Sequence, residues 1–407
     1  MTREMRRFLL IALFMLIIFS ALILLLVPRL DAFLSGPRED GPRIGLGDDM
    51  YKAEVFEIIE EGTVTLGERT QSYQVFRVEV LEGPYKGLIT EVDYGKRQVR
   101  PEGSPLEPGD QLIVSINQAP DGSVNSYFID FVRTKPLLWL LVAFVLLSVL
   151  VGGWQGARGL LGLAVSLVVI LVYIIPSILD GKDPIVVTLI GGFLLLGISL
   201  YLIYGWALKT HAAVLALFFT LVFTGLMINF FVDLTRLTGF GDEDILFVIQ
   251  QVDININLRG LVMAGMLIGA MGALDDLVIT QVSVVLQLHE TDPELGARSL
   301  YQRAMRVGQD HISAMINTLF MAYAGAALPT LILFSLSGQG FIDLINLEFV
   351  AEEVVRILAG SLGLITAAPI STGIASLMIV YRGRLLESRQ DYPRDGEPKH
   401  IGDLDSE

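Results

Sequence analysis

Residues 260–288 read GLVMAGMLIGAMGALDDLVITQVSVVLQL, an apolar run with two adjacent aspartates in its middle. About 20 apolar residues in a helix cross the roughly 30 Å hydrocarbon core of a bilayer. A charged side chain at the centre of such a helix costs about 2.5 to 3.5 kcal/mol on insertion scales, so Asp275 and Asp276 are candidate functional residues. This stretch predicts a membrane helix that handles ions or polar solutes.

The rest of the chain has the composition of an integral membrane protein. Apolar residues make up 53% of its 407 residues, and charged residues only 18%. Long apolar runs predict about eight membrane helices, at residues 8–27, 137–152, 160–179, 184–204, 212–232, 260–288, 312–336 and 354–381. The first run follows a basic start and exceeds the core of a signal peptide in length, which favours an uncleaved anchor.

Two counts narrow the function classes. The chain has no cysteine, which excludes disulfides and thiolate metal sites. Its net charge of −15 argues against a nucleic-acid partner, because no basic surface is left to neutralise phosphates. The lipid bilayer is therefore the first predicted partner, and the composition gives no indication of an oligomeric state.

The basic residues between the predicted helices indicate the orientation. Short cytoplasmic loops of membrane proteins are enriched in Lys and Arg. With eight helices, this rule predicts a protein of the cytoplasmic membrane whose N- and C-termini both lie in the cytoplasm. The inner segments would then carry Arg158, Lys209, Arg298, Arg303, Arg306, Arg382 and Arg384.

The sequence predicts four parts. Residues 1–28 form the anchor, 38–135 a β-domain, 136–384 a seven-helix membrane domain, and 385–407 a disordered acidic cytoplasmic tail. The β-domain shows five runs of period-two alternation, which predict a small all-β barrel of the SH3-like or OB kind. The orientation places it outside the cytoplasm, where an envelope protein or peptide is its candidate partner.

Small and polar residues share one face of the sixth predicted helix. Gly265, Gly269, Gly272 and Asp276 recur at spacings of three or four, as do Thr280 and Ser283 beyond them. Small residues let a neighbouring membrane helix approach closely. The glycines therefore predict a helix-packing groove, which either ends at a merely polar surface or leads to a buried carboxylate at Asp276.

The seventh predicted helix carries a second polar group. Asp310 and Asn317 share a face, and His311 lies one position round. Together with Asp275 and Asp276 they predict an ion- or proton-binding site, with a divalent cation at Asp276 and Asp310 as one candidate. No other cofactor is predicted. Two structural alternatives stay open, namely simple pairing of these groups and a helix-capping role for Asp310.

An enzyme is the least favoured class. The Gly-Ala-Leu-Asp-Asp stretch superficially resembles the Gly-x-Gly-Asp of intramembrane aspartyl proteases, but no second Tyr-Asp element accompanies it. His289-Glu290 lacks the second histidine of a zinc-protease motif. No catalytic residue is therefore assigned.

Several motifs resemble those of the bacterial YibE/F family of multipass membrane proteins. They are Met271-Gly272-Ala273-Leu274-Asp275-Asp276, Thr280-Gln281, Gly308-Gln309-Asp310-His311, Asn317-Thr318-Leu319 and Ala322-Tyr323-Ala324-Gly325-Ala326-Ala327-Leu328-Pro329. The resemblance implies the layout of an anchor, a small β-domain and further membrane helices, and it assigns no substrate.

The leading hypothesis is an ion- or proton-coupled transporter or permease-like protein whose solute is not predicted. The alternative is a non-transporting membrane scaffold or sensor whose exported β-domain binds an envelope partner.

Overall fold

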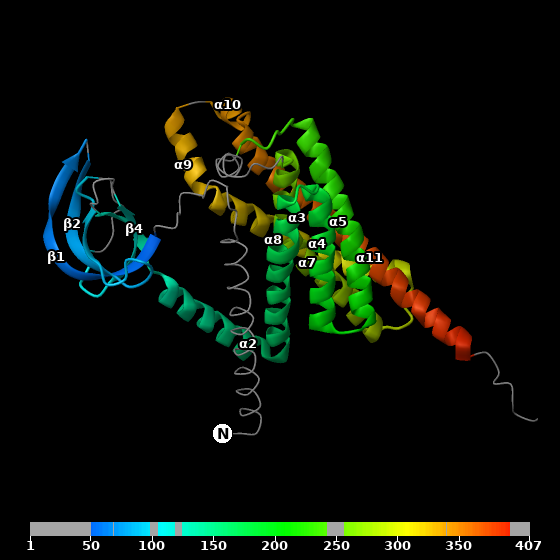
Figure 1. Ribbon diagram of the computed structural model, residues 1–407. Helices are drawn as coiled ribbons and strands as arrows, with labels where there is room; N and C mark the ends of the chain where they lie inside the picture. The colour runs from blue at the N-terminus through cyan, green and yellow to red at the C-terminus, as the bar shows by residue number, and fades with distance from the viewer. Residues whose placement is uncertain are drawn as a thin grey trace, which may run out of the picture. The chain divides into compact units, whose positions relative to one another are not determined.

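The computed structural model describes residues 50–67, 69–97, 105–118, 124–241, 256–338 and 340–390. They form two compact units, which divide between Leu147 and Ser148. The first unit contains a β-barrel and the second is a helical bundle (Figure 1). The predicted anchor at residues 8–27 and most of the predicted tail lie outside the described residues.

The barrel consists of five strands: β1 (Met50–Leu66), β2 (Arg69–Val80), β3 (Ile89–Tyr94), β4 (Gln111–Gln118) and β5 (Val124–Phe131). It closes in the order β1-β2-β3-β5-β4, because β4 pairs back onto β1. Among the described strands, β3 and β5 pair in parallel and the other neighbours are antiparallel. These are the five alternating runs of the sequence, so the predicted small β-barrel is confirmed, and its SH3-like or OB kind stays a prediction.

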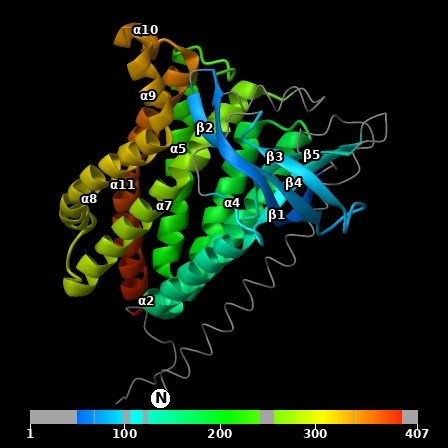
Figure 2. The same ribbon diagram turned by 90° about the vertical axis from the view of Figure 1, so that its left-hand side faces the viewer.

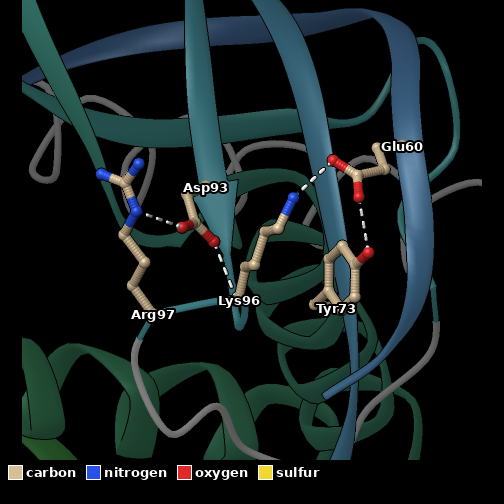
Figure 3. A network of polar contacts seen from close by, with 5 residues as sticks. All are labelled: Glu60, Tyr73, Asp93, Lys96 and Arg97. Atoms are coloured by element: carbon tan, nitrogen blue, oxygen red, sulfur yellow. Dashed lines mark hydrogen bonds and ion pairs between the residues drawn. The ribbon is translucent and has the colours of Figure 1, made fainter.

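A polar network on the barrel links β1, β2 and the turn after β3 (Figure 3). Lys96 Nζ and the Tyr73 hydroxyl each donate to the Glu60 carboxylate at 2.6 Å. Beside them, the Lys96 backbone N donates to Asp93 at 2.8 Å, and Arg97 pairs with Asp93 at 3.6 Å. The bond from Lys96, and then that from Tyr73, lowers the pKa of Glu60, whereas Glu60 raises the pKa of Lys96.

The lowered pKa of Glu60 predicts a pH-dependent contribution to barrel stability. Such a carboxylate stabilises the fold above its unfolded pKa, and the contribution disappears as pH falls through the folded pKa. We expect Glu60→Gln to speed hydrogen exchange of the β1–β2 amides relative to wild type at neutral pH, but not at about pH 3. Glu61→Gln is the matched control, since Glu61 is an exposed neighbour of Glu60 on β1, whereas Glu60 carries the ion pair with Lys96. A Glu60→Gln effect equal at both pH values would contradict this account.

The second unit is helical. Its elements are α2 (Thr134–Val169, which begins in the first unit), η1 (Ile170–Ile174), α3 (Ile175–Leu179), α4 (Pro184–Tyr204), α5 (Leu208–Leu234), α7 (Leu258–Thr291), α8 (Ala297–Ala326), α9 (Leu328–Ser337), α10 (Phe341–Ile345) and α11 (Glu348–Gln390). α11 thus extends into the stretch predicted as a disordered tail.

α7 lies at the centre of this bundle (Figure 2). It packs against α4, α5, α8 and α11, and its buried apolar residues belong to one large core cluster. Side-chain caps fix where the long helices begin. The Asn257 carboxamide accepts from Gly260 N at 3.0 Å at the start of α7, and Asp183 accepts from Ile185 N at 3.0 Å at the start of α4.

α2 is not one continuous helix. Gly153 has φ 57° and ψ −135°, outside the helical region, and a Cβ on Gly156 would lie 2.1 Å from the carbonyl oxygen of Ser148. The chain therefore bends sharply where the sequence predicts a short connection between two spans. The stretch Thr134–Leu179 has 46 residues, about 69 Å at 1.5 Å per residue, which is more than twice the hydrocarbon thickness.

Five helical stretches of the described residues are long and apolar enough to cross a membrane, and α8 with α9 forms a sixth if that bent pair is one span. Eight were predicted. The difference has two sources: the predicted anchor lies outside the described residues, and the predicted second and third helices fall together in Thr134–Leu179. The length and composition of these helices are consistent with the predicted membrane class, and the number of eight crossings stays a prediction.

Proline affects the predicted spans in three ways. A π-helical turn, η1, directly precedes α3 with its Pro176. Pro329 starts α9, which is bent by 66° from α8. α11 continues through Pro369 without a break. Because proline has no N–H, Pro369 inside α11 lacks a helical hydrogen bond, whereas Pro329 lies in the first turn of α9, where an N–H has no helical partner.

Candidate functional site

The two adjacent aspartates of α7 lie in different surroundings. Asp275 is half-buried, and its Oδ1 is buried with no hydrogen-bond partner among the described residues. Asp276 is exposed. Neighbouring residues of a helix point about 100° apart, so one can face the bundle while the other faces outward. The sequence favoured Asp276 as the principal carboxylate, whereas the structure gives Asp275 the more enclosed position.

The polar residues of α8 lie mainly on its outer side. Asp310 and Asn317 are exposed, as are Gln309 and Ser313. His311 is half-buried, and its Nε2 is buried without a hydrogen-bond partner in the described part of the chain. In a membrane, such an exposed polar side needs water or another polypeptide against it, because hydrocarbon cannot satisfy its polar groups.

Asp310 does not cap α8. The helix begins at Ala297, directly after Gly296, so Asp310 lies well inside it. The capping alternative is therefore wrong. The apolar run at residues 312–336 led to a later predicted start, because the first turns of α8 carry several charged residues and resemble a loop in hydropathy. The charge of Asp310 therefore lies on the exposed side of α8.

The predicted glycine groove is only partly occupied. A Cβ on Gly269 would lie 2.2 Å from the Tyr323 hydroxyl oxygen of α8, so this glycine permits a close helix approach. At Gly265 and Gly272, an added Cβ would meet no atom within 4 Å. Both positions are exposed. The described residues thus use one of the three glycines for packing.

The predicted site residues lie at a similar depth, and no hydrogen bond or ion pair joins them in the part of the chain that the structure describes. α7 and α8 run antiparallel, with Gly269 beside Tyr323 and Gln281 beside Gly308. Asp275 lies midway between Gly269 and Gln281 in α7, and Asn317 lies between Gly308 and Tyr323 in α8. Among the residues that the structure describes, no three His, Asp or Glu side chains are grouped so that they could hold a metal ion.

Gln281 occupies the junction of three helices, a role that sequence reasoning did not assign. It is fully buried, and its Oε1 accepts from Thr372 Oγ1 of α11 at 3.1 Å. A Cβ on Gly308 of α8 would lie 2.9 Å from Gln281 Nε2. That Nε2 has no partner among the described residues. Gly308 of the Gly-Gln-Asp-His motif therefore makes room for a buried amide.

A signal for this junction was present in the sequence. A glutamine among apolar residues of a membrane helix needs a polar partner, and buried hydroxyls follow Pro369 in α11. Ser371 and Ser376 flank Thr372 there, and all three are buried. Ser376 Oγ is buried without a partner in the described residues. The interface between α7 and α11 is thus polar at this level, although most of the core is apolar.

Comparison with known proteins agrees with the motifs. The family described as YibE/F-like protein matches residues 140–381, which include α4, α5, α7, α8 and α9 in full. Searches of curated proteins and of solved structures found no match.

Proposed function

The chain belongs to the YibE/F-like family, and on that premise we propose that it is a multi-spanning transporter in which Asp275 couples solute movement to proton binding. The observation that carries this proposal is the buried Oδ1 of Asp275, midway along α7, which has no hydrogen-bond partner among the residues that the structure describes. An ionised carboxylate without donors is costly away from water. A proton bound there removes the charge and supplies a donor of its own.

The proton is a better candidate than a divalent cation. Ca²⁺ in proteins takes six to eight oxygen ligands, and Mg²⁺ needs near-octahedral coordination. The described residues offer no cluster of three acidic or histidine side chains for such an ion. A proton needs only one acceptor. His311, with its buried Nε2, and the exposed Asp276 and Asp310 would connect that acceptor to water.

The bend between α8 and α9 supports a transporter over a static bundle. Transporter sites are typically formed by discontinuous membrane helices, whose ends expose unpaired backbone groups. α8 and α9 are such a pair. The chain bends by 66° between them at Ala327, and Pro329 lies in the first turn of α9. The orientation proposed from the basic residues puts both termini in the bacterial cytoplasm and the barrel outside it.

The test needs no knowledge of the solute. Purified protein in liposomes is adsorbed on a solid-supported membrane and exposed to a step toward lower pH, and separately to steps of Na⁺ and of Mg²⁺. Proton binding inside the membrane displaces charge, so we expect a transient current for the pH step that protein-free liposomes lack. A current only for a metal ion would reassign the coupling ion. No current for any step would favour the scaffold or sensor alternative.

A further inference from the structure

A cleft of about 600 Å³ lies at the bend between α8 and α9, away from Gln281. The hydroxyl-bearing Tyr323 and Thr330 line one part of it, and the apolar Leu333 and Phe349 another. Its volume falls within the range of about 300 to 1,000 Å³ typical of small-molecule sites. It would hold an organic solute rather than a bare ion.

Three charged residues of α11 line the same cleft. Arg356 Nη2 donates to Glu352 at 2.9 Å, and Nη1 pairs with Glu353 at 3.2 Å. The Glu352 residue is 4% exposed. Two carboxylates thus contact one guanidinium. The more accessible Glu353 is placed to meet a positive charge on a ligand, because its side chain is 31% exposed against 5% for Glu352.

The guanidinium also has a free donor. Arg356 Nε is buried and has no hydrogen-bond partner among the described residues. A buried N–H without an acceptor is costly, so a ligand that supplies an acceptor oxygen gains by filling this place. Arginine recognises carboxylates particularly well through its fixed donor geometry. The cleft is therefore suited to a ligand that carries both a negatively charged oxygen and a positively charged group.

The walls of the cleft are held in place. The Glu348 carboxylate accepts from Thr238 N at 2.6 Å and from Gly239 N at 2.8 Å. This clamp ties the chain after α5 to the start of α11. There, a Cβ on Gly241 would lie 2.9 Å from Phe349 N. The charged group therefore sits on a braced segment rather than on a loose helix end.

We propose that this cleft binds a small zwitterionic solute of the amino-acid type. Its ammonium group pairs with Glu353, its carboxylate accepts from Arg356 Nε, and its apolar part lies against Leu333 and Phe349. That this solute is also the one transported rests on the proposed function, whereas its binding does not. An amine without a carboxylate, or an acid without an ammonium group, satisfies only half of the site.

The test is binding to the purified full-length protein in detergent, with no proton gradient. The twenty standard amino acids are screened by thermal shift, and the best one is compared by calorimetry with its decarboxylated amine and its deaminated acid. We expect both fragments to bind at least about tenfold more weakly than the intact amino acid. If no amino acid binds, or if the amine binds as tightly as the amino acid, the proposal is overturned.

Two variants locate the binding. Glu353→Gln is expected to weaken it by about tenfold, whereas Glu290→Gln, an exposed change at the end of α7, leaves it unchanged. Arg356→Lys keeps the charge but removes the Nε donor, and we expect it to reduce the preference for the amino acid over its amine. Equal binding by Glu353→Gln and wild type would place the ligand elsewhere. Amino-acid binding without a pH-step current would support the cleft as a binding site and refute proton coupling. A pH-step current without amino-acid binding would support proton coupling and refute the cleft as a binding site.

Discussion

Asp275→Asn is expected to reduce the pH-step current by roughly tenfold, because the amide cannot exchange a proton and the other aspartates of α7 and α8, Asp276 and Asp310, are exposed. The side chain is nearly isosteric, so the helix packing around α7 should persist. The current is measured on solid-supported membranes at equal protein density, and insertion is checked by the thermal unfolding of the variant in detergent.

The controls for this variant come from the same two helices. Asp276→Asn and Asp310→Asn change exposed carboxylates, and each should keep more than about half of the current. These controls also test which aspartate of α7 binds the proton, because the sequence favoured Asp276 and the burial in the structure favours Asp275. A current that survives in Asp275→Asn but is lost in Asp276→Asn would refute the assignment made here.

Gly308→Val is expected to destabilise the bundle by about 1–3 kcal/mol, the usual cost of overpacking a core. The new side chain would meet the buried amide of Gln281, which cannot move away without losing its bond to Thr372. Thermal unfolding of the purified protein, followed by tryptophan fluorescence, measures the loss.

Gly272→Val is the matched control, because an added Cβ there meets no atom within 4 Å. It should change stability by less than about 0.5 kcal/mol, as exposed substitutions usually do. The double variant Gln281→Ala/Gly308→Val should lose less stability than the two single variants added together, since the first change makes room for the second. Additive losses would mean that Gln281 and Gly308 do not share a contact.

Much of the fold was predictable because its signals are local. Alternation with a period of two identifies a strand from its own residues, and all five barrel strands followed from it. Apolar runs likewise located α4, α5, α7 and α11. The break near Gly153 was also predicted, as a short connection, but its backbone conformation was not, and the true start of α8 at Ala297 was missed. Both depend on backbone conformation and tertiary packing rather than on hydropathy.

The candidate site was predictable only at the level of helices. Asp275 and Asp276 are adjacent, so a helical wheel alone does not decide which of them faces the bundle. The roles of Gln281 and Gly308 arise from the meeting of three helices far apart in the sequence. Sequence reasoning assigned Arg356 no functional role, since an ion pair beside a cleft is visible only once α8, α9 and α11 are placed.

Carbodiimide labelling with peptide mapping tests the central claim most directly, because the reagent attacks protonated carboxyl groups in apolar surroundings. It is applied to the purified protein in detergent over a range of pH, with wild type, Asp275→Asn and Asp276→Asn compared. We predict labelling at Asp275 that increases as pH falls, that is absent in Asp275→Asn and that remains in Asp276→Asn. Labelling that maps to Asp276 or Asp310 instead, or no labelling within α7 at any pH, would contradict the account.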